Sequence, residues 1–381
     1  MSLRANWSYP TSIRFGAGRI SEIVEACQAT GITKPLLVTD KGLAKLDITR
    51  KTLQILDSAG LGRAVFSDVD PNPTEENAAA GIEMFKEGKH DGVIAFGGGS
   101  GLDLGKLIAF MIGQTRPIWD FEDIDDWWTR AETSSIMPII AVPTTAGTGS
   151  EVGRASVITN SQTHEKKIIF HPKFLPSIVI CDPELTIGMP SFITAGTGMD
   201  AFAHCLEAYC SPHYHPMSQG MALEGMRLVK EYLPIVFKDK NHIIGRCQMM
   251  SAAIMGATAF QKGLGAIHAA SHPIGAVHNT HHGTTNAVIM REALRLNRPE
   301  IETKIEALCN YLEISGGFQG FLSFITNLNT ELNIPGSLTE LGVKKPNIEA
   351  LVDSALRDPS CAGNPVNLTK ENMTELVENC L

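Results

Sequence analysis

Five histidines gather in one uncharged stretch of the chain. The stretch from Gly263 to Met290 contains no Asp, Glu, Lys or Arg, yet it holds five of the chain's twelve histidines: His268, His272, His278, His281 and His282. Its small apolar residues at helical spacing predict a buried helix. A buried imidazole needs a partner, because an unpaired polar group in an apolar interior costs free energy. Backbone carbonyls could supply that partner, but five histidines in one run favour a metal site, since neutral histidine is the commonest protein metal ligand.

A carboxylate and further imidazoles have the spacing of a shared site. Asp200 and His204 are four residues apart, so they lie on one face of a helix. His268 and His272 have the same spacing, and His282 follows ten residues later. One carboxylate with several imidazoles suits Fe²⁺ or Zn²⁺ and is a poor match for Mg²⁺ or Ca²⁺. The spacing alone leaves open which of these histidines are ligands.

Two glycine- and hydroxyl-rich turns follow buried apolar runs. The run 91–96 leads into Gly97, Gly98, Gly99 and Ser100, and the run 138–142 leads into the turn 143–151 with Thr144, Thr145 and Thr148. The first turn could cradle phosphate or be a tight strand-to-helix turn; the second could bind anions or cap a helix. The spacing is that of neither GxGxxG nor a Walker A loop. Two such turns in one sheet favour a ligand site, because open α/β sheets bind ligands at the carboxyl ends of their strands.

Periodicity divides the chain near residue 187. Short apolar runs predict parallel strands in the first half, at 12–15, 35–40, 64–66, 91–96, 138–142 and 178–183, with a hairpin-like part at 155–170. Beyond residue 189 the pattern predicts only helices, at 192–210, 217–237, 241–261, 264–279, 284–295, 299–313, 318–331, 347–356 and 369–379. We therefore predict a Rossmann-like α/β domain at 1–187 and an all-α domain at 188–381.

Composition excludes several classes of protein. A chain of 381 residues is long enough for two domains, and its formal net charge of −9 gives no basic surface for nucleic acid. The eight cysteines are scattered without a CxxC pair, which favours reduced thiols in a cytoplasmic protein. The first ten residues lack a long apolar segment, so we expect no secretory signal. The histidines and Pro273 argue against a membrane span at 263–290.

The motifs together resemble one family along nearly the whole chain. They are GGGS at 97–100 with Asp103 and Lys106, PTTAGTGSE at 143–151, DP-L at 182–185, TGMDAFAHCLEAY at 197–209, HAASHPIGAVHNTHHG at 268–283, and Asp358-Pro359 with Asn364-Pro365. On these residues the chain resembles the iron-containing (group III) alcohol dehydrogenases.

The resemblance implies a dehydroquinate synthase-like architecture and a ligand set. It implies a dinucleotide-binding N-terminal domain, a helical C-terminal domain, and a cleft between them that holds the metal, Fe²⁺ or Zn²⁺. The family's four ligands fall on Asp200, His204, His268 and His282. His272 falls on a histidine near the substrate, where it is a candidate for relaying the alcohol proton. His278 and His281 match no functional position, which favours structural roles.

The resemblance also places the cofactor, NAD. It implies cofactor contacts at Gly97, Gly98, Gly99, Ser100, Asp103, Thr144, Thr145, Thr148, Lys166 and Leu185, with Lys167 adjacent if the register slips. Asp40 ends its strand where the family meets the adenosine ribose. A carboxylate there accepts hydrogen bonds from ribose hydroxyls and repels a 2′-phosphate, which favours NAD over NADP.

The implied reaction is hydride transfer between a small primary alcohol or aldehyde and NAD, with the alkoxide held by the divalent metal. An alternative is a hydroxyacid dehydrogenase of the 4-hydroxybutyrate type, in which Lys262 or Arg154 anchors the substrate carboxylate. Phe260 is a candidate to line an apolar pocket. A remote alternative is a metal- or nucleotide-binding protein without turnover. The family implies a homodimer or larger homo-oligomer.

Overall fold

The structure is a computed structural model that describes residues 11–163 and 165–381. Residues 1–10, on which the expectation about a secretory signal rests, and residue 164 lie outside the described part. The described chain forms two compact units. The N-terminal unit comprises residues 11–145 and 149–187, and the helical unit comprises residues 146–148 and 188–381.

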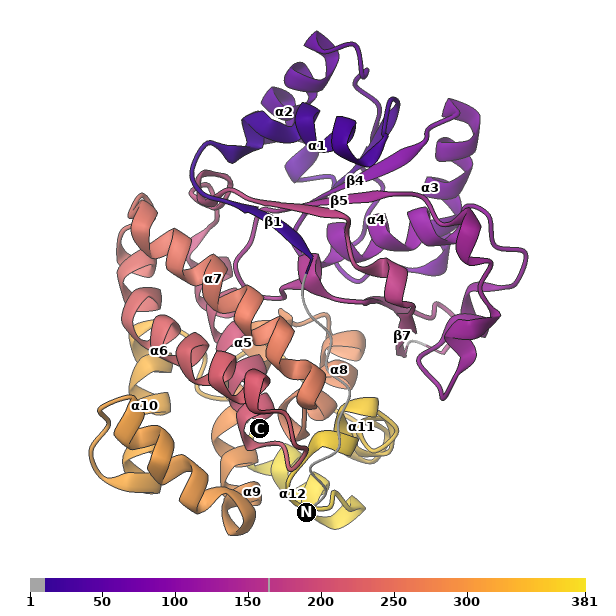
Figure 1. The fold of residues 1–381 in the computed structure, drawn as a ribbon. Coiled ribbons are helices and arrows are strands. Elements are labelled where there is room, and N and C mark those ends of the chain that lie inside the picture. The colour runs from indigo at the N-terminus through magenta and orange to yellow at the C-terminus, as the bar shows by residue number, and fades with distance from the viewer. Residues whose placement is uncertain (1–10, 164) are drawn as a thin grey trace. The chain divides into compact units, whose positions relative to one another are not determined.

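A parallel sheet organises the N-terminal unit (Figure 1). Its strands are β1 (Ser12–Phe15), β2 (Pro35–Val38), β3 (Val65–Phe66), β4 (Gly92–Gly97), β5 (Ile139–Pro143) and β8 (Ile178–Cys181), in the order β1-β8-β5-β4-β2-β3. The chain leaves β2 to place β3 on one side and β4 on the other. Strand order therefore reverses between β2 and β4, and a doubly wound sheet binds ligands at the carboxyl ends of such a pair. The predicted hairpin is a separate antiparallel pair, β6 (Ala155–Thr159) and β7 (Lys166–Phe170).

Helices cover both faces of the sheet, as side-chain alternation along the strands requires. Ile94 and Phe96 of β4 join the buried cluster beneath the first two α-helices, whereas Ala95 meets Gly105 on the opposite face. The elements are η1 (Arg19–Glu22), α1 (Ile23–Thr30), η2 (Leu43–Lys45), α2 (Asp47–Ser58), α3 (Glu75–Gly88), α4 (Gly99–Met111), η3 (Ile118–Phe121), η4 (Trp127–Arg130), η5 (Thr133–Ser135), η6 (Ser150–Val152), η7 (Pro172–Phe174) and η8 (Pro183–Thr186).

Helices alone build the other unit around a central buried helix, α5 (Ser191–Cys210), which packs against α6 (Pro216–Lys238), α7 (Ile243–Ala259) and α9 (His282–Tyr311) (Figure 1). The remaining elements are η9 (Phe260–Lys262), α8 (Ala266–His278), α10 (Gly317–Glu331), α11 (Ile348–Ala355), η10 (Pro359–Gly363) and α12 (Lys370–Asn379). A parallel α/β sheet in one unit and helices in the other confirm the predicted fold class.

One helix boundary differs from the prediction. The predicted helices 284–295 and 299–313 are one helix, α9, which runs through Pro299. Proline removes one helical hydrogen bond, but the buried stripe continues beyond it at Ile301, Ile305 and Leu308, and this packing keeps the helix whole. The histidine-rich stretch divides into α8 and α9, in agreement with the predicted helices 264–279 and 284–295, and Asn279 ends α8 in a left-handed conformation with φ of 52°.

Within the described residues, none of the helices combines the length and the apolar character that crossing a membrane would require.

Candidate functional site

Helix α5 presents three ionisable side chains on one face. Asp200, His204 and Glu207 are spaced four and three residues apart, which aligns them along the helix. Their exposed fractions are only 2%, 5% and 7%. Three buried ionisable groups on one face need partners from other elements.

The first turn of α9 lies directly against α5. A Cβ built on Gly283 would stand 2.0 Å from the carbonyl oxygen of Gly196, so only glycine allows this approach. The contact brings His282, the first residue of α9, to the α5 face. His281 precedes it as the helix cap, and its Nδ1 accepts a hydrogen bond from the Thr284 N–H at 3.3 Å, which is the structural role expected of it.

Three imidazole nitrogens lie around one carboxylate oxygen. The Asp200 Oδ1 atom lies 3.7 Å from His204 Nε2, 3.7 Å from His268 Nε2 and 3.5 Å from His282 Nε2. Ligand atoms about 2.1 Å from a tetrahedral ion stand about 3.4 Å apart, so these separations suit a single bridging cation. Asp200, His204 and His268 form a group in which one ligand atom of each residue lies within 4.8 Å of the others. The structure thus brings together all four predicted ligands, from α5, α8 and α9.

Charges within the cluster depend on one another. Burial alone would raise the pKa of Asp200, but His204, His282 and His268 hold it well below the ordinary range. Burial lowers the pKa of His204 to about 4, so this imidazole is neutral at neutral pH, as metal ligation requires. Burial also opposes the charging of His268, yet Glu207 and Asp200 raise its pKa to about 9, because both carboxylates face its ring.

Asn286 was missed by the sequence analysis, although it lies one helical turn after His282. Its amide Nδ2 is 2.8 Å from Asp200 Oδ1 and 3.3 Å from the Nε2 atoms of both His268 and His282. The residue is fully buried, and its Oδ1 has no hydrogen-bond partner among the described residues. A buried cluster of a carboxylate, three imidazoles and an unsatisfied amide oxygen fits a bound cation better than it fits an apolar core.

Glu207 was also missed by the sequence analysis, and its carboxylate has two roles: it binds His268 and it caps helix α8. Its Oε2 accepts a hydrogen bond from His268 Nδ1 at 2.5 Å, and its Oε1 accepts one from the Ile267 N–H at 2.7 Å. The neighbouring Ala266 N–H donates to Asn364 Oδ1 at 3.0 Å. Glu207 and Asn364 therefore cap the amino end of α8, whose own N-cap is the side-chain-free Gly265. The available signal was position i+7 from Asp200 on a predicted helix.

His272 lies beside the cluster but faces a different partner. Its Nδ1 donates to Asp358 Oδ2 at 2.7 Å, and its ring stacks on that of His282 with centroids 5.2 Å apart. His278 lies at the carboxyl end of α8, the last residue of that helix.

Lys262 does not have the environment expected of a substrate anchor. Its ammonium donates to the carbonyls of Ala208, Tyr209 and Ser211 at 2.8, 3.1 and 2.9 Å, which are orphan acceptors at the carboxyl end of α5. Burial lowers its pKa to about 8. All three N–H donors are used, so Lys262 is a helix cap, and a substrate carboxylate would have to displace backbone bonds.

The other two substrate candidates lie in different units. The Phe260 ring lies 5.1 Å from that of His204, so this residue forms an apolar wall beside the metal cluster. Arg154, in the N-terminal unit, places its guanidinium 5.4 Å from the centre of the Phe170 ring.

The two predicted turns are tied together in the N-terminal unit. The Thr144 N–H donates to the carbonyl of Gly97 at 2.9 Å, and a Cβ on Gly98 would meet the Thr145 side chain at 3.1 Å. Helix α4 begins at Gly99, so its N-terminal amides lie at the carboxyl end of β4. Such amides can bind pyrophosphate, because they lack helical partners and carry the positive end of the helix dipole. Thr148 belongs to the helical unit.

Asp103 has a bracing role that the resemblance did not imply. Its carboxylate accepts hydrogen bonds from Ser150 Oγ at 2.5 Å and from the Val157 N–H at 3.1 Å, and it lies 3.1 Å from the Lys106 ammonium. Lys106 in turn donates to the carbonyls of Ser150 and Ala155. These bonds fasten α4 to the second turn and to β6, and they leave Asp103 little capacity for a cofactor.

The remaining cofactor candidates differ in surroundings. Asp40 follows β2, and its Oδ1 accepts from the N–H groups of Gly42 and Leu43 at 2.8 and 2.9 Å. Lys167 is paired with Glu122 at 3.1 Å and with Glu165 at 3.5 Å. Leu185 is buried in the apolar cluster under the sheet.

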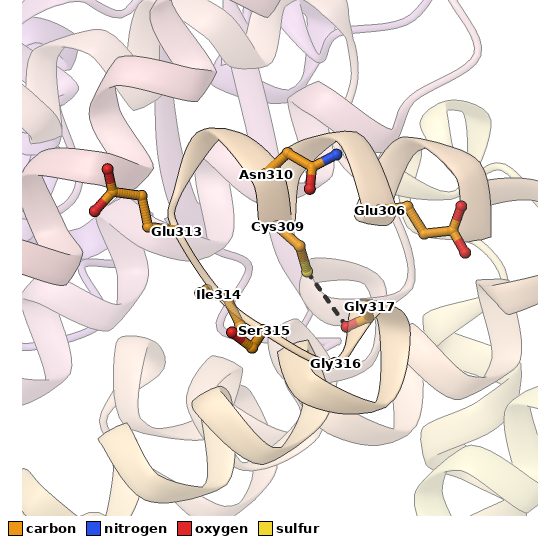
Figure 2. A pocket seen from close by; sticks show the side chains of 8 residues that line it. All are labelled: Glu306, Cys309, Asn310, Glu313, Ile314, Ser315, Gly316 and Gly317. Carbon is orange, nitrogen blue, oxygen red and sulfur yellow. Dashed lines mark hydrogen bonds between the residues drawn. The ribbon is translucent and has the colours of Figure 1, made fainter.

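An open hollow of about 690 Å³ lies elsewhere, at the turn between α9 and α10 (Figure 2). It is lined by Glu306, Cys309, Asn310, Glu313, Ile314, Ser315, Gly316 and Gly317. None of the predicted site residues lines it, so it does not bear on the predicted chemistry.

The fold thus consists of a parallel α/β sheet of the kind that binds nucleotides and, in the same chain, a helical unit whose buried cluster has the side chains of a metal site. Comparison with known proteins agrees. The profile described as iron-containing alcohol dehydrogenase matches residues 10–183, and that of the C-terminal part of the Fe-containing alcohol dehydrogenase family matches residues 194–381. The chain therefore belongs to the iron-containing alcohol dehydrogenase family, which confirms the predicted family and the predicted alcohol dehydrogenase activity.

Individual relatives cover nearly the full length. The chain is 34% identical to a 4-hydroxybutyrate dehydrogenase of Cupriavidus necator, over 98% of this chain and 99% of the relative. The crystal structure of a 1,3-propanediol oxidoreductase matches with a TM-score of 0.93 and 33% identity, covering 99% of each chain. That of a sulfoacetaldehyde reductase from Bifidobacterium kashiwanohense in complex with NAD⁺ matches with a TM-score of 0.90 and 29% identity, over 100% and 99% of the two chains.

Proposed function

We propose that this alcohol dehydrogenase transfers hydride between a small primary alcohol or aldehyde and NAD, with Fe²⁺ held by Asp200, His204, His268 and His282. The observation that carries the proposal is that the Nε2 atoms of three histidines each lie 3.5–3.7 Å from the same Asp200 carboxylate oxygen. Three imidazoles and one carboxylate suit Fe²⁺ and Zn²⁺ alike, and we name Fe²⁺ because of the family. The ion would supply a Lewis acid toward the alcohol oxygen.

The chain's own residues bind and orient the reactants. The N–H groups at the start of α4 would hold the NAD pyrophosphate, and Asp40 would accept from the ribose hydroxyls and disfavour NADP. Thr144, Thr145, Thr148 and Lys166 are the further proposed cofactor contacts. Phe260 would exclude water beside the cluster, and His272 would accept the alcohol proton at Nε2.

The second candidate is a hydroxyacid dehydrogenase, favoured by the 34% identity to a 4-hydroxybutyrate dehydrogenase. Because the Lys262 ammonium is fully used as a helix cap, Arg154 is the remaining candidate for a substrate carboxylate. A kcat/KM for 4-hydroxybutyrate that exceeds that for butanol, and that falls selectively in Arg154→Ala, would support the hydroxyacid reading. Equal ratios in the two proteins would reject it.

The test joins elemental analysis with NADH absorbance on a panel of alcohols and aldehydes. Wild type purified without oxygen should contain one Fe²⁺ per chain and turn over. His282→Ala should lose both metal and activity, with its circular dichroism unchanged, because the ligand set is broken while the helix packing remains. Full turnover in chelator-treated, metal-free buffer would contradict the proposal, and a metal-loaded protein inert toward the whole panel would favour binding without turnover.

We further propose a cytoplasmic homo-oligomer, with residues 1–187 as the dinucleotide-binding domain and residues 188–381 as the metal-binding domain.

A further inference from the structure

Asp358 lies 86 residues from His272 in sequence, yet its carboxylate is held against the His272 ring. The Oδ2 atom accepts from His272 Nδ1 at 2.7 Å, and the Oδ1 atom accepts from the Ser360 N–H at 2.8 Å. Side-chain exposure is 9% for Asp358 and 13% for His272. The backbone around the carboxylate is fixed as well, because the Asp358 N–H donates to Ala355 and the Cys361 N–H donates to the Asp358 carbonyl, both at 3.1 Å. The carboxylate is thus a rigid acceptor.

From this geometry we propose that Asp358 is a positioning residue that keeps the proton of neutral His272 on Nδ1 and leaves Nε2 as the acceptor. An ionised carboxylate can only accept hydrogen bonds, so the nitrogen that faces it must carry the hydrogen. The inference rests on the proposed function, in which the alcohol hydroxyl proton passes to His272 Nε2 while hydride reduces NAD⁺ to NADH and the alcohol becomes the aldehyde.

Helix capping alone does not explain an aspartate here. Asparagine and aspartate cap helices about equally well, and the chain uses Asn347 as the cap of α11, where its Oδ1 accepts from the Ala350 N–H at 3.2 Å. Asp358 caps η10 with one oxygen only. The second carboxylate oxygen accepts the hydrogen bond from His272, and asparagine could not make this bond because its side chain has only one oxygen.

The substitution Asp358→Asn separates the two roles. The amide has one oxygen to share between a backbone N–H and an imidazole. The backbone N–H of Ser360 cannot give up its proton, whereas an imidazole can move its proton between nitrogens. The amide oxygen should therefore stay with Ser360, and the amide NH₂ should face His272 Nδ1. His272 then carries its proton on Nε2 and can no longer accept one there.

The test is the two-bond ¹⁵N–¹H spectrum of histidine-labelled, Zn²⁺-loaded protein, with the His272 signals assigned by their loss in His272→Gln. Wild type should show the Nδ1–H form of His272 and Asp358→Asn the Nε2–H form. In the same variant kcat should fall about a hundredfold, the size of a general base contribution, with KM nearly unchanged. Asn347→Ala is the matched control: it removes a neighbouring cap without touching a histidine, so it should lower thermal stability but leave both the spectrum and kcat as in wild type.

A His272 that keeps Nδ1–H in Asp358→Asn would overturn the proposal, as would the same spectral change in Asn347→Ala. The spectrum does not depend on turnover. If wild type proves inactive on every substrate, the proposed function fails, while the tautomer comparison still decides whether Asp358 positions His272.

Discussion

The two candidate binding regions, the cluster around Asp200 and the turns after β4 and β5, bind through different kinds of group. In the helical unit, the cluster is built of side chains: Asp200, three histidines, Glu207 and Asn286, all closely packed by α5, α8 and α9. In the N-terminal unit, the turns after β4 and β5 offer mainly backbone N–H groups, and their glycines clear space. A cation needs several lone pairs at one point, which only side chains from separate helices can supply here, whereas a pyrophosphate needs several N–H donors in a row, which backbone supplies directly.

The contrast is not complete, because the N-terminal unit also buries ionisable side chains, and Glu151 is one of them. Glu151 is the last residue of the second turn, is 2% exposed, and has a pKa that burial raises to about 7. The folded protein holds this proton more tightly than the unfolded chain, whose value is near 4.5. The contribution to stability is therefore present below pH 4.5 and is lost as pH rises toward 7, a loss of about 3 kcal/mol.

Glu151→Gln should remove this loss. Urea denaturation should find the variant as stable as wild type near pH 4.5 and more stable at pH 8. The exposed Glu184→Gln serves as the control and should leave the pH dependence of wild type intact. A variant that follows the wild-type curve at every pH would show that Glu151 does not carry the effect.

The substitution Glu207→Gln tests the region that is built of side chains, the proposed metal site. The Ile267 N–H is a fixed donor, so the amide oxygen should stay with it and the amide NH₂ should face His268 Nδ1. The His268 proton then moves to Nε2, the proposed ligand atom. We expect metal affinity, measured by competition with a chelator of known affinity, to fall 10–100-fold, the usual effect of losing a carboxylate behind a ligating histidine. Unchanged affinity would mean that Glu207 only caps α8.

The substitution Gly98→Ala tests the region that offers backbone N–H groups, the proposed cofactor site at the turns after β4 and β5. The new methyl would meet the Thr145 side chain at 3.1 Å, at the junction of the two turns. Crowding of this kind costs about 1–3 kcal/mol, so KM for NAD should rise about tenfold while metal content stays at the wild-type level. Gly220→Ala, where an added Cβ meets nothing within 4 Å, is the control. A loss of metal in Gly98→Ala would mean that the two regions are not independent.

Sequence reasoning succeeded where the signal was local. Strand runs, glycine turns and the i,i+4 spacing of Asp200 and His204 lie within one element each, and the structure has those elements. It failed where packing decides. The helix through Pro299 is continued by buried contacts that a local proline rule does not weigh.

The site partners were missed for the same reason. Glu207 meets His268 across 61 residues, and Asp358 meets His272 across 86. Lys262 is a candidate substrate anchor in the sequence because its charge is visible there, whereas the carbonyls that bind it are backbone atoms, which every residue has. A sequence shows which groups are present; the number of acceptors already occupied is a property of the fold.

Helix α5 and the start of α8 are linked at two places, which bears on how the ion would bind. Glu207 fastens α5 to the start of α8, and Lys262, just before α8, closes the end of α5 while its own carbonyl accepts from Ser211 Oγ at 2.9 Å. Hydrogen bonds within the protein therefore hold α5, which carries Asp200 and His204, at two points against the segment that leads to His268. These protein hydrogen bonds hold the proposed ligand residues in place without an ion, so the ion would bind to a site that is already folded. A zinc finger differs, because its chain folds only around the metal.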